Sequence, residues 1–241
     1  MTNRFANAET VGERVYRRLR TDILFGRLAP SQRLKLDVMK EAYGVSISTL
    51  RELLSRLTSE GLIVAESARG FGVAPVSPEN FREIANLRQL LECHALERSF
   101  AAGDMDWEGR VVAAHHKLAL VEKRAAAGGS DHGELLKRYD WEFHQALLSA
   151  CGSKVLLEAH GEVFDKYLRY LIIAVVFRGE IAVREHRQLL EYALARDAKA
   201  AQAVLVKHIQ ECVTFTLSNG RLGPRSEQPK ADSRRKIAAP A

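Results

Sequence analysis

The stretch YDWEFHQALL, residues 139–148, places an aspartate and a histidine four residues apart in a segment with the pattern of an amphipathic helix. Four residues is about one helical turn, so Asp140 and His144 are predicted to project from the same face. A carboxylate and an imidazole on one face could hold one ligand together. The alternative is an exposed pair with no further role, and the choice depends on the elements that position it.

The chain has 241 residues, of which 46% are hydrophobic, which is enough for two modest domains or one large one. Its most apolar run, residues 170–177, is much shorter than the roughly 18 residues that a membrane span needs. The N-terminal segment lacks the features of a signal peptide, so we expect a cytoplasmic protein. Three widely spaced cysteines, Cys93, Cys151 and Cys212, favour buried reduced thiols over a disulfide framework or a thiolate zinc site.

The net charge of +6 is unevenly distributed along the chain. Residues 1–76 and 219–241 carry an excess of lysine and arginine, whereas residues 77–218 are slightly acidic. Such a division suggests a segment that faces nucleic acid, attached to a body with another role. A basic enzyme could show the same distribution.

Three helices are predicted within the first 76 residues. Thr10 and Glu13 form a possible capping box at the start of the first helix. The second helix lies in LKLDVMKEAYG and ends at Gly44, and Ser46 caps the third. The apolar residues expected to point inward are Leu36, Val38 and Met39 in the second helix and Leu50, Leu53, Leu54 and Leu57 in the third. A helix, a tight turn and another helix is the arrangement that places a recognition helix in the major groove of DNA.

Two short β-prone runs follow, residues 62–65 and 71–75, and predict a small hairpin. The segment between them carries Arg69 and Gly70. An arginine on a thin tip can enter the narrow minor groove of DNA, and glycine lets the backbone approach the sugar-phosphate edge. The alternative is a hairpin that only closes a small helical subdomain.

From Ser77 onward the sequence predicts helices and no strand, which indicates an all-α bundle. Ser77 and Pro78 form a helix start, so the connection between the two parts is short. The predicted helices span about 78–102, 106–127, 131–150, 153–178, 181–196 and 198–218. The remaining residues, 219–241, combine proline, glycine and charge without periodicity and are expected to form a disordered basic tail.

The segment from about residue 19 to residue 76 resembles the winged helix-turn-helix of GntR-family transcription regulators. The landmarks that carry the resemblance are G-x-L-x-P at 26–30, Y-G-V-S at 43–46, L-R-E-x-L at 50–54, E-G-L at 60–62 and R-G-F at 69–71. The resemblance implies double-stranded DNA as a partner and an operator that the protein recognises.

The same resemblance implies which residues contact DNA: Arg33 near the backbone, Ser46, Ser48, Thr49 and Arg51 at the start of the recognition helix, and Arg69 and Gly70 on the wing. Arg51 is expected to read a guanine, because its fork of donors matches the O6 and N7 edge. Most relatives have an arginine after the serine of V-S, whereas this chain has Ile47. Ile47 could instead pack on a thymine methyl group, so the family's operator sequence does not transfer.

Residues 77–218 resemble the FCD ligand-binding domain of the FadR-like branch of this family, through LRQLLE at 87–92, D-x-x-x-H at 140–144, the EHRQLLEYALARDAKAA stretch and a later V-K-H. The resemblance implies that Asp140, His144, His186 and His208 bind a divalent metal ion. Three imidazoles and one carboxylate suit zinc above all, and also nickel, manganese or iron. Remaining coordination positions could receive the carboxylate of an effector.

Arg88 has two interpretations. In the fold that the resemblance implies, this arginine points toward the cavity, where its guanidinium could bind an effector's carboxylate. The alternative is a salt bridge to Glu92, four residues later on the same helix.

Together these features predict a mainly α protein with three parts: a winged helix-turn-helix at 1–76 with three helices and a small hairpin, an all-α bundle of six or seven helices at 77–218, and the tail at 219–241. The predicted function is a homodimeric, ligand-responsive transcription regulator, first of all a repressor that a small carboxylate metabolite relieves from DNA. Two alternatives remain, a metal-dependent enzyme with a three-histidine, one-aspartate site and a regulator that senses the metal itself.

Overall fold

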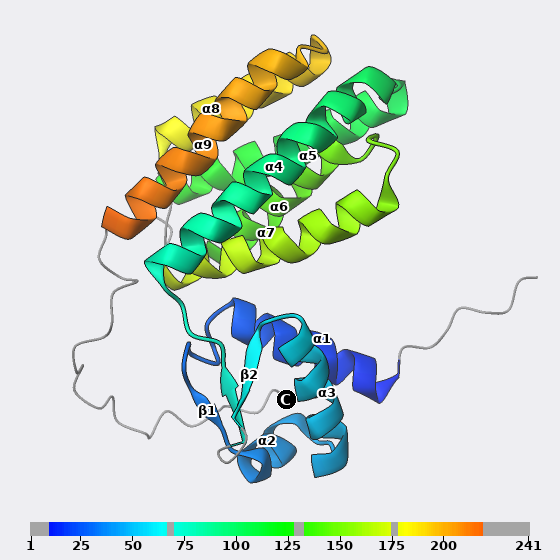
Figure 1. The fold of residues 1–241 in the computed structure, drawn as a ribbon. Helices are drawn as coiled ribbons and strands as arrows, with labels where there is room; N and C mark the ends of the chain where they lie inside the picture. Colours follow the sequence, from blue (N-terminus) through cyan, green and yellow to red (C-terminus); the bar gives the residue numbers. More distant parts are fainter. Residues whose placement is uncertain (1–9, 67–69, 128–132, 175–177, 219–241) are drawn as a thin grey trace, which may run out of the picture.

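The computed structural model describes residues 10–66, 70–127, 133–174 and 178–218, and Figure 1 shows an elongated helical bundle above a smaller unit that contains the sheet. The smaller unit consists of α1 (Val11–Leu24), β1 (Arg33–Leu34), α2 (Leu36–Tyr43), α3 (Ile47–Ser59), β2 (Ile63–Glu66) and β3 (Gly70–Val73). The bundle consists of α4 (Pro78–Ala102), α5 (Met105–Ala126), α6 (Gly133–Leu148), α7 (Lys154–Ala174), α8 (Glu180–Leu194) and α9 (Ala198–Ser218). The predicted fold class is confirmed. The predicted tail lies outside the described residues.

The three N-terminal helices form where their caps and apolar spacing predict. Thr10 caps α1 by accepting from the Glu13 backbone N–H at 3.2 Å. The reciprocal half of the capping box is absent, because the Glu13 carboxylate accepts from Arg56 of α3 at 2.9 Å instead. The buried side chains of these helices share one core that includes Leu19, Ile23, Leu50, Leu54 and Leu57.

The prediction that Val38 points inward was wrong. Its side chain is 62% exposed, while Met39 of the same helix is buried in the core. Successive helical residues are rotated by about 100°, so a helix of eight residues that buries Met39 turns Val38 away. Gly44 ends this helix with φ of +66°, a conformation that other residues rarely adopt, and so permits the tight turn into α3.

The small sheet has the strand order β1-β3-β2 with antiparallel pairs throughout. The predicted hairpin corresponds to β2 and β3, in which Val64 pairs with Gly72. The sequence did not predict β1, whose two residues are too few for a pattern; it pairs Arg33 with Gly72 and Leu34 with Phe71. This third strand places Arg33 on the wing rather than in a free loop.

The six bundle helices lie close to their predicted ranges because the breaks between them are chemically marked. Ser77 caps α4 by accepting from the Asn80 backbone N–H at 3.1 Å, and Asp104 caps α5 in the same way. At Gly103, between these helices, a Cβ atom would lie 2.5 Å from Arg196 and 2.6 Å from Trp107. Only glycine leaves room for this close helix-to-helix corner.

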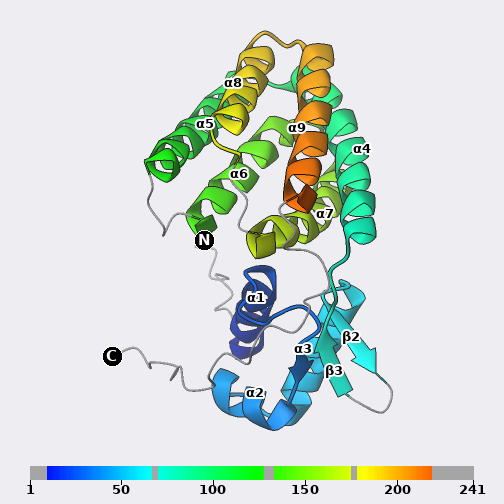
Figure 2. The ribbon, with the colours of Figure 1, turned by 90° about the vertical axis from the view of Figure 1, so that its left-hand side faces the viewer.

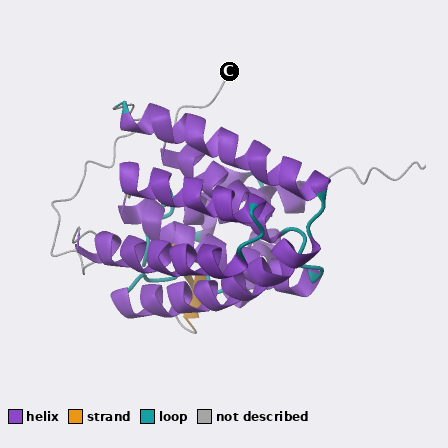
Figure 3. Ribbon diagram, turned by 90° about the horizontal axis from the view of Figure 1, so that it is seen from above, coloured by secondary structure: helices purple, strands orange, loops and turns teal. Residues whose placement is uncertain are grey.

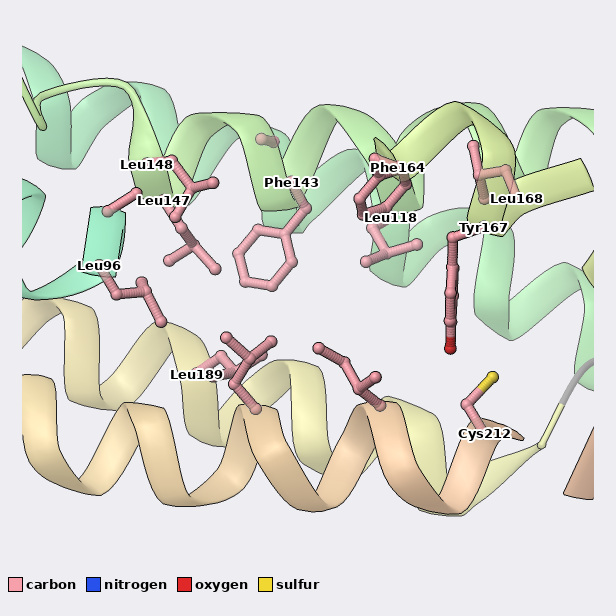
Figure 4. Close-up of a cluster of buried hydrophobic side chains, with 14 of the residues drawn as sticks. Leu96, Leu118, Phe143, Leu147, Leu148, Phe164, Tyr167, Leu168, Leu189 and Cys212 are labelled. Carbon is pink, nitrogen blue, oxygen red and sulfur yellow. The ribbon is translucent and has the colours of Figure 1, made fainter. Parts of the chain in front are cut away.

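Apolar side chains from all six helices fill the bundle interior. Figure 3 shows the bundle from above, with its helices running side by side across the view. Figure 4 shows Phe143, Leu147 and Phe164 reaching inward from one layer of helices toward Leu189 and Cys212 of the other. Cys151 and Cys212 are buried free thiols, and Cys93 is a partly buried one, as the sequence predicted. No helix in the described part of the chain is long and apolar enough to cross a membrane.

The two units meet where α1 lies against α7 (Figure 2). Arg20 of α1 pairs with Asp165 of α7 at 2.6 Å and with Glu60, directly after α3, at 3.0 Å. Arg27 pairs with Glu134 at the start of α6 at 3.0 Å. These contacts agree with the expectation of a short connection and close coupling between the units.

Candidate metal centre and DNA surface

The structure brings the four predicted ligands together. Asp140 and His144 project from α6, His186 from α8 and His208 from α9, and all four are buried. One ligand atom from each residue lies within 4.8 Å of the others, and we call this set the four-residue cluster. The alternative of an exposed Asp140–His144 pair is therefore wrong.

The spacing of the cluster is compatible with a bound ion. Atoms that lie about 2.0–2.1 Å from one metal ion can be at most about 4.2 Å apart, on opposite sides of it. The four ligand atoms, within 4.8 Å of one another, would have to move closer together to share one ion. The buried Nε2 of His186 has no hydrogen-bond partner among the described residues, although Asp140 Oδ1 lies 3.3 Å away.

Each histidine of the cluster has a glutamate behind it. The Nδ1 atoms of His144, His186 and His208 lie 3.1, 2.7 and 2.9 Å from a carboxylate oxygen. These oxygens belong to Glu92 of α4, Glu122 of α5 and Glu185 of α8, in that order. A carboxylate that accepts the Nδ1 proton leaves Nε2 as the free ligand atom and orients the ring, which is the usual outer shell of a histidine metal site.

The electrostatics of the cluster favour an anionic Asp140 and two neutral histidines. Burial would raise the pKa of Asp140, but His186 and then His144 lower it below its ordinary range. Burial lowers the pKa of His144, and burial together with the neighbouring histidines lowers that of His208 far more. Neutral imidazoles and a carboxylate are the forms that bind a metal ion.

His186 differs from the other two histidines. Burial opposes its charge, but the adjacent carboxylates of Asp140 and Glu122 raise its pKa to about 9. At neutral pH both ring nitrogens therefore carry a proton, and Nε2 must lose its proton before it can bind a cation.

Arg88 of α4 lies at the edge of the cluster, where it forms the predicted salt bridge and lines the cavity, while its binding of an effector stays a prediction. Its Nε donates to Glu92 at 2.7 Å, which is the predicted salt bridge, and both groups are 1% exposed. Its Nη2 also lies 3.3 Å from His144 Nε2, and Arg88 lines the same cavity as the cluster. Although burial favours the neutral acid, Arg88 and then His144 hold the pKa of Glu92 well below its ordinary range.

The cavity at the cluster is small, about 30 Å³. A cavity of about 10–15 Å³ on this measure already holds one water molecule, so the space suits an ion with one or two waters rather than an organic molecule. Arg178 helps to line it and donates to Glu185 at 2.5 Å. An effector carboxylate could enter only if Arg88 or Arg178 moved.

The sequence reasoning missed Glu122, Glu185 and Arg178, and it considered Glu92 only as the partner of Arg88. A signal was present: Glu122 follows buried Leu118 by four residues, and Glu185 lies between buried Ala182 and Leu189 on one helical face. An acidic residue at a core position of an amphipathic helix is costly to bury unless it is paired. Such positions therefore identify partners of a buried polar site.

The described residues predicted to contact DNA belong to the start of α3 and to the small sheet of the smaller unit. Ser46 caps α3 and bonds to both Ser48 and Thr49, while Arg51 is exposed one turn further along. Arg33 is exposed on β1, and Gly70 opens β3 with φ of +85°. Within the described residues no ion pair involves Arg33 or Arg51. Arg69, predicted at the wing tip, lies outside the described residues.

Two family models match the chain. Residues 11–73 match the bacterial regulatory proteins of the gntR family, and residues 83–211 match the FCD domain. The first range coincides with the smaller unit, and the second lies within the bundle.

Individual proteins are similar over most of their length. A protein named uncharacterized HTH-type transcriptional regulator BphR, from Paraburkholderia xenovorans, is 34% identical over 90% of this chain and 89% of its own. The HTH-type transcriptional repressor GlaR of Escherichia coli is 30% identical over 80% of this chain and 90% of its own. The solved structure of E. coli McbR/YncC has a TM-score of 0.74 at 19% identity, over 88% of this chain and all of that one, and shows the same fold.

Proposed function

The chain belongs to the GntR family of bacterial transcription regulators and carries an FCD domain, and from this we propose a ligand-responsive repressor whose bundle holds a divalent metal ion. We divide it into a DNA-binding domain at 1–76 and an effector domain at 77–218. The matched families and the named relatives are transcription regulators, not enzymes, so the enzyme alternative is not carried further.

The observation that carries the metal proposal is the pairing of three buried imidazoles with three buried glutamates around one carboxylate, Asp140. Asp140, His144, His186 and His208 would hold the ion, and zinc is the first candidate, with nickel, manganese or iron next. A bound divalent ion would supply a positive charge that anchors an anionic effector. Glu92, Glu122 and Glu185 fix the ring orientations that this requires.

For the effector we propose a small carboxylate that binds beside the metal ion and pairs with Arg88. The guanidinium of Arg88 already points at the cluster, and its present partner is another carboxylate, Glu92. An effector of this class would compete with Glu92 for the same fork of donors. Because the volume of the cavity is only about 30 Å³, the effector has to displace side chains when it enters. Effector binding is therefore sensitive to the conformation of α4.

The DNA-binding proposal assigns roles to residues at the start of α3 and on the small sheet of the smaller domain. Arg51 would read a guanine, and Ser46, Ser48 and Thr49 would contact phosphates near the N-terminus of α3. Arg33 and the glycine at residue 70 would contact the backbone from the wing, together with Arg69. Ile47, half-buried between exposed neighbours, would pack on a thymine methyl group.

We propose that two copies of the chain bind one operator, since a single short recognition helix reads too few base pairs for useful specificity. The outer face of α4 supports a dimer of the bundle. Leu87 is 46% and Leu90 is 66% exposed there, three residues apart on one side of a helix. Leucines at that spacing would be covered by a symmetric second copy.

Repression is proposed because the named relative GlaR of E. coli is a repressor. A second candidate, a regulator that responds to the metal ion alone, is favoured by the size of the cavity, which suits an ion better than an organic molecule. The two candidates differ in what releases the operator: a carboxylate added to metal-loaded protein, or metal added to metal-free protein.

The first experiment measures metal per chain by elemental analysis on untagged protein purified without chelator. We expect close to one divalent ion in the wild type and in His116→Ala, an exposed histidine, and none in His144→Ala or His208→Ala. An operator selected from random duplex DNA then serves to titrate carboxylates and metals by mobility shift. Wild-type protein without metal, even after incubation with zinc, nickel and manganese, would contradict the metal proposal.

A further inference from the structure

Arg169 of α7 is a buried cation that forms no ion pair with the described residues. It is 4% exposed, its Nη2 donates to the backbone carbonyl of Ala74, and its buried Nε has no hydrogen-bond partner among the described residues. The other deeply buried arginines are paired, Arg88 with Glu92 at 2.7 Å and Arg178 with Glu185 at 2.5 Å. Burial lowers the pKa of Arg169, and among the described residues only Tyr170 opposes this. A buried charge is costly unless something compensates it.

Arg169 lines a cavity of about 260 Å³ at the junction of the two domains, which we call the joint cavity. Its walls come from the corner after α3 at Gly61 and Leu62, from the linker at residues 74–77, and from α4 and α7. Lys166 is the second cation in the wall, and its Nζ lies 3.6 Å from where a side chain at Gly61 would begin. None of the described residues that line the cavity is acidic.

The far wall of the joint cavity is rigid and polar. Tyr170 stacks on Phe81 with ring centroids 4.6 Å apart and donates its hydroxyl proton to Asn80 at 2.8 Å. The backbone N–H of Ser77 points at the same hydroxyl at 3.4 Å. The volume is slightly below the usual range for small-molecule sites, about 300–1,000 Å³, so a small ligand would fit.

We propose that the joint cavity binds a small organic anion, a carboxylate or a phosphate ester, held by Arg169 and Lys166. Two cations and no acid among the described residues of the wall are the chemistry of an anion site. No residue lines both this cavity and the one at the four-residue cluster, so the two sites are separate.

The location of the site has a regulatory consequence, which rests on the proposed function. Its walls belong to the DNA-binding domain, the linker and the effector domain at once. An anion bound there would bridge them and favour one placement of the recognition helix, so it would change operator affinity.

Thermal unfolding of the full-length protein in sodium phosphate or sodium succinate, against sodium chloride of equal ionic strength, tests the binding. We expect a concentration-dependent rise in Tm with at least one of the two anions. The anion with the larger rise at equal concentration identifies the ligand class. No rise beyond that in chloride would overturn the proposal.

Variants separate this site from general salt effects and from the metal site. We expect Arg169→Gln to lose the anion-dependent rise and Lys166→Gln to weaken anion affinity at least about tenfold. Lys154 is an 89% exposed lysine of the same helix, and Lys154→Gln should retain the anion-dependent rise in Tm and the anion affinity of the wild type. His144→Ala should retain them as well. If Arg169→Gln does not fold, Lys166→Gln decides. An unchanged rise in Lys166→Gln, or its loss in His144→Ala, would refute the joint site while leaving the proposed function untouched.

Discussion

At the start of α3 the polar side chains are exposed and bond to near neighbours, whereas around the four-residue cluster they are buried and bond across the bundle. Ser46 contacts Ser48 and Thr49, two and three residues away. His186 contacts Glu122 across 64 residues, and His144 contacts Glu92 across 52. The first surface keeps its donors available to a partner, and the second has internal partners for most of its groups. Substitution of the same residue type should therefore change mainly operator binding in the first region and mainly stability in the second.

The largest expected contrast is between two arginines. Arg88→Met removes one partner of a buried ion pair and leaves the Glu92 carboxylate without its cation, so it should destabilise the protein by about 3–5 kcal/mol. Arg51→Met, at an exposed position, should change the free energy of unfolding by less than about 0.5 kcal/mol. Urea unfolding of metal-free protein at one fixed concentration measures both.

Equal stability of Arg88→Met and the wild type would break the comparison in the bundle. It would mean that the hydrogen bonds of His144 and His160 to Glu92 compensate the carboxylate without Arg88.

The contrast should invert when operator binding is measured. Arg51→Met should weaken binding to a selected operator by about 1–3 kcal/mol and relax the preference at one base position. Arg33→Met, if Arg33 contacts only phosphate, should weaken all sequences alike and reduce the salt dependence. Fluorescence anisotropy over a range of salt concentrations separates these outcomes. An unchanged base preference in Arg51→Met would move the reading role to another residue of α3.

Arg51 and Arg88 also show what the sequence could predict. The family resemblance assigned Arg51 to the start of a helix whose cap, turn and apolar spacing are local patterns, and the residue is exposed there. The salt bridge of Arg88 was predictable for the same reason, since its partner is four residues away. Asp140 and His144 were placed on one face by spacing alone, while His186 and His208 entered only through the family resemblance.

The features that the sequence did not predict depend on contacts between segments that are far apart in the chain. Glu122 and Glu185 carry no local motif, and only the packing of α5 and α8 against α6 and α9 places them behind histidines. The strand β1 was missed because two residues form no pattern until β3 pairs with them. Val38 was placed inward from its apolar character, although the rotation of α2 exposes it.

The glutamates behind the histidines give the next largest effect. Glu122→Gln keeps the shape of the side chain but removes the charge that orients and polarises His186. Metal affinity should fall about 10–100-fold, which corresponds to about 1.4–2.7 kcal/mol. Competition with a chromophoric chelator measures it, with the exposed Glu162→Gln as control. An unchanged affinity would assign Glu122 a packing role only.

The smallest expected effect compares two serines with the same local geometry. Ser46 caps α3 and Ser77 caps α4, and each accepts from a backbone N–H three residues later, at 3.2 and 3.1 Å. Loss of either cap by mutation to alanine should cost about 1 kcal/mol of stability, because the lost hydrogen bond is the same. Only Ser46→Ala should also weaken operator binding, since only that hydroxyl lies on the predicted DNA surface. Equal losses of binding in Ser46→Ala and Ser77→Ala would mean that helix stability, rather than a contact of the Ser46 hydroxyl with DNA, limits recognition.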